Sequence, residues 1–204
     1  MPIPHRRTIL WFLAAAGLLL LTGCVSPNAQ QTRFYRLNPE GGSGLTSETG
    51  GQAVLQPELG VGPVNIAGYL DRPQLINRID PYRLQLRDFD YWAGTLQDNV
   101  LSGLVDALQG CLGRDQVIAY PWHRAVQPKR ELILDISRFD EEVGRFVVKL
   151  RWVLLAERGD KLLAAHQWVI VEPVEGTTPE AQVAAASRAL SRLAERLVVE
   201  INAF

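Results

Sequence analysis

Glu131-Leu-Ile-Leu-Asp-Ile-Ser-Arg-Phe139 alternates apolar and polar residues, and Phe146-Val-Val-Lys-Leu-Arg-Trp-Val-Leu154 repeats the alternation after a short turn. A period of two residues places successive side chains on opposite faces of a strand, so each stretch predicts a strand with one dry face. A second turn at 157–160 leads to a third strand over 161–172. Three sequential strands joined by short turns predict an antiparallel meander.

Two helices are predicted beside this meander. Thr178 caps the last helix, Pro179 opens it, and its apolar residues recur every three or four positions: Val183, Ala186, Leu190, Leu193, Leu197 and Ile201. The first helix is predicted from Trp92 to Gly113, with Asp88-Phe89-Asp90 as its N-cap. Its apolar face is formed by Leu96, Val100, Leu104, Ala107, Leu108 and Cys111. Cys111 is therefore expected to be a small buried residue.

The remaining segments favour strands and turns. We expect strands at 34–37, 59–66 and 116–122, with a bulge or a sheet edge at Pro63 because proline has no backbone donor. Residues 69–78 and 82–86 predict an antiparallel hairpin, and the loop of residues 39–51 is expected to be mobile. The predicted fold class is α+β: a two-layer sandwich, mainly an antiparallel sheet with two helices packed on one face.

The N-terminus has the pattern of a lipoprotein signal peptide. Arg6 and Arg7 make the start basic, and the 13 uncharged residues 9–21 are too few for a transmembrane helix of about 20 residues but fit a signal sequence. Leu21-Thr22-Gly23-Cys24 then matches a bacterial lipobox. Cleavage between Gly23 and Cys24 would make Cys24 the first residue of the mature protein, with acyl chains on its sulfur.

Two alternatives stay open for this segment. An uncleaved signal anchor would make Cys24 incidental, and Arg6-Arg7 also fits a twin-arginine export signal. With cleavage, we expect a signal peptide over 1–23, a lipidated N-terminus and flexible tether over 24–32, and a domain over 33–204. Val25 follows the cysteine where an aspartate usually retains Gram-negative lipoproteins in the inner membrane, so we expect the outer membrane.

Composition and motifs argue against several functional classes. The chain has 21 basic and 22 acidic residues without a basic run, so nucleic-acid binding is not expected. Acylation of Cys24 leaves Cys111 alone and excludes a disulfide framework. The three histidines share no metal-ligand spacing, and no nucleophile elbow or phosphate loop occurs. We therefore predict a protein that is not an enzyme and has no metal or cofactor, apart from the covalent lipid on Cys24.

Two segments mix aromatic, charged and proline residues in the way that binding surfaces do. They are Tyr69-Leu70-Asp71-Arg72-Pro73 and Tyr120-Pro121-Trp122. We predict both as partner-binding residues. The structural alternative is that both are sheet-edge segments in which Tyr69 and Trp122 cap the core.

From Phe34 to the C-terminus the chain resembles the ABC-type transport auxiliary lipoproteins, the PqiC/YmbA-like group. The matching residues are Phe34-Tyr35-Arg36-Leu37, Val61-Gly62-Pro63-Val64, Tyr69 to Gln74, Arg78, Asp90 to Ala93, Tyr120-Pro121-Trp122, Arg138-Phe139, Trp152 and the alanine-rich last helix. The loop of residues 39–51 has no clear counterpart in the family.

The resemblance implies a lipoprotein on the periplasmic side of the outer membrane, taking part in lipid traffic between the two membranes. It would work beside an MCE-domain periplasmic protein and an inner-membrane transporter component, as a docking or ring-forming subunit. Homo-oligomer formation by this chain stays open. The alternative function is a standalone periplasmic lipoprotein that binds an apolar ligand between sheet and helices. A wide apolar cavity would favour that alternative, and a filled core with an exposed patch at Tyr69 to Arg72 would favour the subunit.

Overall fold

The computed structural model describes residues 30–39 and 57–204. The predicted signal peptide, Cys24, most of the tether and nearly all of the loop of residues 39–51 lie outside the described residues. Residues 32–204 form one compact unit.

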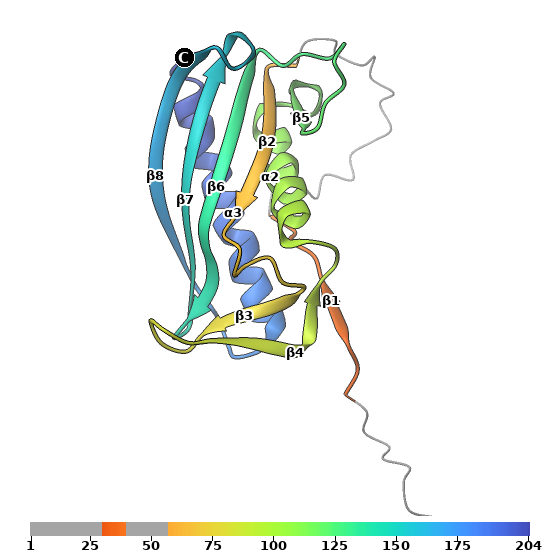
Figure 1. The fold of residues 1–204 in the computed structure, drawn as a ribbon, viewed down its shortest axis with the longest axis vertical. Helices are drawn as coiled ribbons and strands as arrows, with labels where there is room; N and C mark the ends of the chain where they lie inside the picture. Colours follow the sequence, from red (N-terminus) through yellow and green to blue (C-terminus); the bar gives the residue numbers. More distant parts are fainter. Residues whose placement is uncertain (1–29, 40–56) are drawn as a thin grey trace, which may run out of the picture. The chain divides into compact units, whose positions relative to one another are not determined.

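The predicted meander is confirmed and forms the largest part of the sheet (Figure 1). β6 (Arg130–Glu142) pairs antiparallel with β7 (Arg145–Ala156), from Arg130 opposite Ala156 to Glu142 opposite Arg145. β7 pairs antiparallel with β8 (Lys161–Pro173) over its whole length. A register shift between Ile136 and Arg138 lets the lower part of β6 keep Phe139 on the buried face.

The other five strands extend this meander into an eight-stranded mixed sheet. β2 (Leu59–Ile66) runs parallel to β6 on one side and to β5 (Val117–Ala119) on the other. The predicted bulge is confirmed, because the register of β2 shifts between Val61 and Val64, around Pro63. The predicted hairpin is also confirmed as β3 (Gln74–Arg78) and β4 (Leu84–Trp92). β3 runs parallel to the end of β6, and β1 (Arg33–Tyr35) runs parallel to the end of β4.

Both helices cover the same face of the sheet, which confirms the α+β architecture (Figure 1). α3 (Pro179–Ile201) begins as predicted, with the Thr178 hydroxyl accepting from the N–H of Ala181 at 3.2 Å. α2 (Leu96–Leu112) ends at Gly113. Short 3-10 turns follow α2 at Arg114–Gln116 and β7 at Glu157–Gly159. No helix of the described ranges is long and apolar enough to cross a membrane.

The core lies between the helices and the sheet and is filled by large side chains. Leu104, Leu190 and Leu193 from the helices and Leu134 and Trp152 from the sheet have no measurable exposure. Burial of a leucine side chain stabilises a fold by about 1.5–3 kcal/mol. This layer is therefore the main source of stability for the two-layer arrangement.

Two sequence predictions about α2 are wrong. The N-cap is Thr95, whose hydroxyl accepts from the N–H of Asp98 at 3.0 Å, and residues 88–90 belong to β4. Asp90 is buried there because Arg33 pairs with it at 2.8 Å. Cys111 is exposed rather than buried, because the buried stripe continues from Leu108 to Leu112, four residues on, and turns Cys111 to the solvent.

Candidate functional site

The first predicted binding segment is a tight turn between β2 and β3. The N–H of Leu70 donates to the carbonyl of Ala67 at 2.8 Å, and the Leu70 side chain is fully buried in the core. Asp71, Arg72 and Pro73 are exposed, and Tyr69 is half-buried. Leu70 therefore fixes the turn, and the three residues after it present their side chains to solvent.

A buried charge cluster lies under Tyr69, and its centre is Asp140 of β6. The Asp140 carboxylate has no exposed surface and accepts from Arg138 Nε at 2.7 Å and from Arg78 Nη2 at 2.8 Å. The Tyr69 hydroxyl is 3.4 Å from the same carboxylate and donates to the carbonyl of Ser137 at 3.1 Å. Arg78 also lies against the Tyr69 ring, 5.9 Å from its centroid. We call Tyr69, Arg78, Arg138 and Asp140 the Asp140 cluster.

The charges of this cluster perturb its titrating groups. Burial, together with the Asp140 carboxylate, raises the pKa of Tyr69. The hydrogen bond to Asp140 raises the pKa of Arg78, and the hydrogen bond from Arg138 to Glu142, 2.9 Å long, lowers the pKa of that glutamate. Both arginines stay charged and Tyr69 stays neutral at physiological pH. The cluster therefore holds the Tyr69 turn through a fixed set of ion pairs and hydrogen bonds.

A shallow groove of about 430 Å³ opens beside the Asp140 cluster. Its walls add Pro81, Ser137, Glu142 and Lys149 to three members of the cluster. Most of these side chains are charged or polar, with Arg78, Arg138 and Lys149 as the positive groups and Glu142 as the negative one. Such a groove suits a polar segment of another protein better than an apolar molecule.

The second predicted binding segment packs on the other end of β2. The N–H of Tyr120 donates to the carbonyl of Val61 at 2.8 Å, and the Tyr120 and Trp122 rings meet edge to face with centroids 5.4 Å apart. Trp122 lies directly over Gly60, where an added Cβ would be 2.7 Å from its ring. Trp122 is thus partly buried, whereas Tyr120 and Pro121 are exposed.

The two predicted segments are not brought together. Tyr120 bonds to β2 near its beginning, and Tyr69 follows the end of β2, beside the lower part of β6. They form two separate surfaces, one with buried ion pairs behind it and one with aromatic packing behind it. Each is partly structural, since Leu70 and Trp122 lie against the fold.

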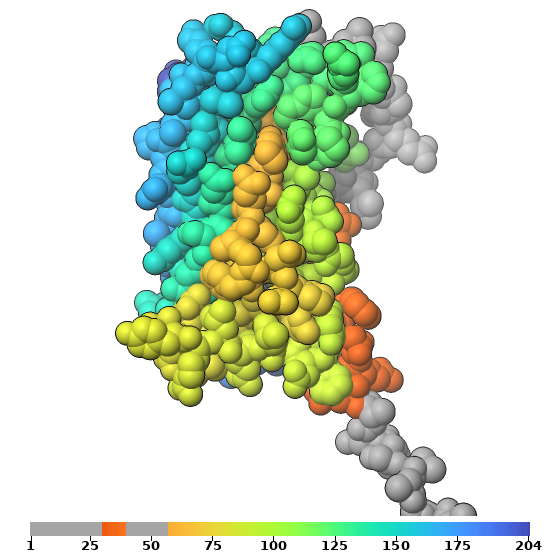
Figure 2. Space-filling view, in the orientation of Figure 1, coloured from red at the N-terminus to blue at the C-terminus, as the bar shows by residue number. Residues whose placement is uncertain are grey.

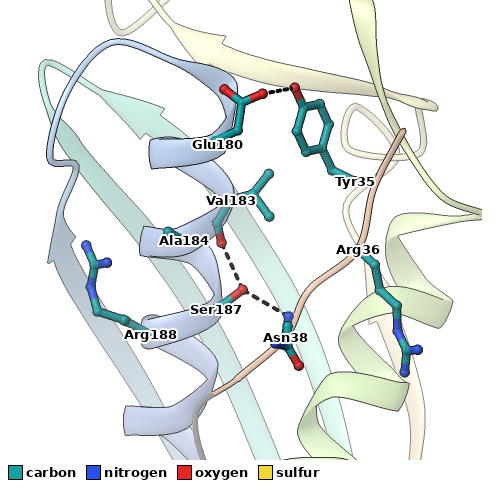
Figure 3. A pocket seen from close by; sticks show the side chains of 8 residues that line it. All are labelled: Tyr35, Arg36, Asn38, Glu180, Val183, Ala184, Ser187 and Arg188. Atoms are coloured by element: carbon teal, nitrogen blue, oxygen red, sulfur yellow. Dashed lines mark hydrogen bonds between the residues drawn. The ribbon is translucent and has the colours of Figure 1, made fainter. Parts of the chain in front are cut away.

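Sequence reasoning missed a third group of side chains, which joins the N-terminal segment to α3. The Tyr35 hydroxyl donates to Glu180 at 2.7 Å (Figure 3). It also lies 3.3 Å from the Asp90 carboxylate. Further along, the Ser187 hydroxyl accepts from the N–H of Asn38 at 3.0 Å and donates to the carbonyl of Val183 at 2.9 Å. Only the aromatic run at 34–37 marked this segment in the sequence, because its partners are distant along the chain.

These residues line a surface pocket of about 320 Å³ between the N-terminal segment and α3. Figure 3 shows Arg36 and Arg188 projecting to opposite sides of it, while Tyr35 points to Glu180. Burial and the hydrogen bond to Glu180 raise the pKa of Tyr35, and that bond lowers the pKa of Glu180. The polar groups satisfy one another across the pocket. The arrangement therefore fastens the segment that follows the tether to the C-terminal helix.

No group of histidine, cysteine, aspartate and glutamate side chains in the described ranges could hold a metal ion. His123 accepts from the N–H of Ala125 at 3.1 Å, and His166 lies 5.1 Å from the Trp152 ring. Both contacts are ordinary structural ones.

Comparisons with known proteins agree with the fold. The family model of the ABC-type transport auxiliary lipoprotein component matches residues 35–198. No curated protein matches the chain. Among solved structures, an uncharacterized protein aligns with a TM-score of 0.68 at 16% identity, covering 84% of this chain and 99% of its own.

Two further structures are more distant. A Xanthomonas campestris protein of the family DUF330 aligns with a TM-score of 0.59 at 19% identity, covering 81% of this chain and 92% of its own. The PelC dodecamer from Paraburkholderia phytofirmans aligns with a TM-score of 0.40 at 11% identity, over 71% of this chain and 92% of PelC. That last likeness is too weak to support an argument about assembly.

Proposed function

The chain belongs to the family of ABC-type transport auxiliary lipoprotein components, and on this premise we propose that it is a non-enzymatic subunit of an envelope lipid-transport system. Acyl chains on Cys24 would hold it at the outer membrane, facing the periplasm. There it would dock an MCE-domain periplasmic protein that works with an inner-membrane transporter component. Residues 1–23 would be removed, 24–32 would form the tether, and 33–204 would be the docking domain.

The filled core is the observation that carries this proposal over the alternative of a standalone lipoprotein that binds an apolar ligand. Such a ligand needs a concave, mostly apolar cavity. In the described domain, the space between sheet and helices is occupied by side chains such as Leu104, Leu134 and Trp152. Three of the pockets on its surface have charged residues in their walls. A filled core of this kind favours a protein that acts through contacts on its surface.

We propose that the docking surfaces are the two predicted segments. At one end of β2, Asp71, Arg72 and Pro73 project beside the polar groove of the Asp140 cluster. At the other end, Tyr120 and Pro121 are exposed above Trp122. Tethering would raise the local concentration of both surfaces for a partner near the same membrane.

Crosslinking in intact envelopes, followed by purification of the lipidated protein, tests the partner. We expect an MCE-domain protein to be recovered, and recovery to fall for Arg72→Glu but not for Arg158→Glu, an exposed arginine in the turn after β7. Purified protein that carries bound lipid but recovers no MCE-domain protein would instead establish the standalone ligand-binding function.

The anchor is tested separately by Cys24→Ala. One acyl chain gives only marginal membrane binding, and stable anchoring takes two or more, so loss of the acylation site should remove the protein from the outer-membrane fraction. Cys111→Ala is the matched control, because this exposed cysteine lies on α2 and should leave fractionation unchanged. A Cys24→Ala chain that still fractionates with the outer membrane would contradict the acylation.

A further inference from the structure

Exposed apolar side chains gather at one end of the domain. We call this end, formed by β1, β3, β4, the β3–β4 turn and the β6–β7 turn, the hairpin end. Among the described residues, seven of the thirteen exposed large hydrophobic side chains lie here: Phe34, Ile79, Tyr82, Leu84, Leu86, Phe89 and Val143. The remaining six are spread over β8, the start of the β5–β6 connection and the last part of α3 and the C-terminus.

The pairing of the strands brings the elements that carry these side chains together at one end of the domain. Arg78 of β3 lies opposite Glu142 of β6 and Leu84 of β4, so the two turns that carry Ile79 and Val143 are neighbours. β1 pairs with the other end of β4, and the Phe34 ring lies 5.9 Å from the Tyr91 ring. Figure 1 shows the hairpin lying across the lower end of the domain, and Figure 2 shows it next to β1 there.

Isolated exposed apolar residues are common on proteins, but a contiguous group marks a contact surface. The exposure here is largest at the outermost positions: 95% for Tyr82 at the tip of the hairpin, 84% for Val143 and 68% for Phe34. Aromatic and aliphatic side chains at the rim of a domain are the residue types that enter the boundary between lipid headgroups and acyl chains.

The length of the tether indicates what covers this surface. With Cys24 acylated as proposed, only the nine residues 24–32 would separate the start of β1 from the membrane. Nine extended residues span at most about 30 Å. β6, with 13 residues, is about 43 Å long, so the hairpin end, where β1 enters the domain, is held nearer to the lipid than the far end. Tyr35, Asn38 and their partners on α3 keep this entry point fixed.

We infer that the hairpin end is a second, non-covalent membrane contact, in which Ile79, Tyr82, Phe34 and their apolar neighbours enter the headgroup region of the leaflet that holds the acyl chains. This inference rests on the proposed acylation of Cys24. The contact orients the domain on the membrane. It turns Tyr120, at the opposite end of β2, away from the lipid and toward the periplasm. The groove of the Asp140 cluster borders the hairpin end at Arg78 and Pro81, so a partner that docks there would lie against the membrane surface.

Depth-dependent fluorescence quenching tests this orientation on the full lipidated protein. A Cys111→Ser background leaves the acylated Cys24 as its only other cysteine, and an environment-sensitive dye is attached through Tyr82→Cys or, as the matched control, Val199→Cys on the exposed face of α3 near its end. The proteins are reconstituted into vesicles of phosphatidylethanolamine and phosphatidylglycerol containing a spin-labelled lipid. Lipid quenching should be at least about threefold stronger for the dye at Tyr82, because interfacial side chains lie about 5–10 Å inside the headgroup boundary.

Three results would contradict the membrane contact of the hairpin end, and each has a different meaning. Equal quenching at the two positions, or none at Tyr82, in a protein that stays with the membrane would overturn the hairpin contact and leave the anchor intact. A wild-type protein that does not enter the membrane fraction would overturn the acylation, and the inference with it. If the dye at Tyr82 escapes lipid quenching and becomes protected from an aqueous quencher only at high protein concentration, a second copy of this chain covers the hairpin end and the inference is wrong.

Discussion

Tyr69 and Tyr120 lie at opposite ends of β2, and the fold holds the two by different means. Tyr69 rests on the Asp140 cluster, where one fully buried carboxylate meets two arginines with 15% of their side chains exposed. Tyr120 stands beside Trp122, whose ring lies against Gly60. The Tyr69 turn is held by ion pairs and hydrogen bonds. The Tyr120 segment is held by the close fit of Trp122 against Gly60, which has no side chain.

This difference separates two kinds of dependence on distant residues. The Tyr69 turn needs a partner 71 residues further along the chain, Asp140, whose loss removes the carboxylate that Arg78 and Arg138 share. The Tyr120 segment needs two glycines of β2 to keep no side chain, because an added Cβ would lie 2.7 Å from Trp122 at Gly60 and 2.6 Å from Tyr120 at Gly62. Electrostatic support fails when a group is removed, and steric support fails when a group is added. The variants below break each support in its own way.

Removal of the buried carboxylate should have the largest effect. Asp140→Ala leaves Arg78 and Arg138 without their shared partner in a poorly hydrated position, and breaking a buried ion pair costs about 3–5 kcal/mol. The free energy of unfolding, measured by urea denaturation, should fall by that amount. Asp135→Ala is the control, because Asp135 pairs with Arg151 at 3.3 Å on the exposed face of β6 and should cost at most about 1 kcal/mol. Equal losses for the two variants would mean that Asp140 is not the centre of this support.

Addition of one methyl group under Trp122 should have the next largest effect. In Gly60→Ala the new Cβ would lie 2.7 Å from both Pro128 Cγ and Trp122 Cζ3, so the ring must move, at a cost of about 1–3 kcal/mol. Gly68→Ala is the matched control, since nothing lies within 4 Å of its added Cβ. The same urea measurement applies, and Trp122→Ala in the Gly60→Ala background should recover part of the loss. A stable Gly60→Ala protein with unchanged Trp122 fluorescence would show that the ring is not held there.

The elements that could be predicted from the sequence are those whose signals are local. Alternation over β6 and β7 and the Thr178-Pro179 start of α3 depend on neighbours in the chain, and the structure agrees with them. The N-cap of α2 could not be read correctly, because Asp90 resembles a cap until Arg33, 57 residues away, is known to pair with it. The prediction that Cys111 is buried was wrong because the apolar stripe of α2 passes through the next residue, Leu112, instead.

The candidate site shows the same division between features with a local sequence signal and features that depend on distant residues. Tyr69 and Trp122 were predicted as partner-binding residues from their residue types, but the contacts that hold them in place were not predicted. Asp140 has its partners Tyr69 and Arg78 62 or more residues away, and Glu180 is 145 residues from Tyr35. No spacing rule connects positions that meet only after parallel strands such as β2, β3 and β6 have assembled. A long-range contact of this kind has to be seen in the fold.

The smallest effect is expected from the hydroxyl group of Tyr69. Tyr69→Phe removes the donor to the Ser137 carbonyl and a weak contact with Asp140, so it should lower the free energy of unfolding by about 1 kcal/mol. Tyr120→Phe is the matched control, because the Tyr120 hydroxyl makes no hydrogen bond to any residue of the described ranges and 45% of the residue is exposed. Equal effects of the two substitutions would remove the distinction between the two ends of β2.

The pH dependence sharpens this last comparison. Burial and the Asp140 carboxylate raise the pKa of Tyr69 above its ordinary value of 10.0, so the folded protein holds this proton more tightly than the unfolded chain does. The stability contributed by the neutral hydroxyl is therefore fully present below pH 10 and is lost as the pH rises through the raised pKa. The difference in unfolding free energy between wild type and Tyr69→Phe should shrink above pH 10, while the difference between wild type and Tyr120→Phe should not follow that course. Urea denaturation at a series of alkaline pH values, with phenolate absorbance recorded in parallel, measures both. A gap that widens above pH 10 would mean that Arg78 stabilises the ionised form of Tyr69 more strongly than burial and the Asp140 carboxylate oppose it.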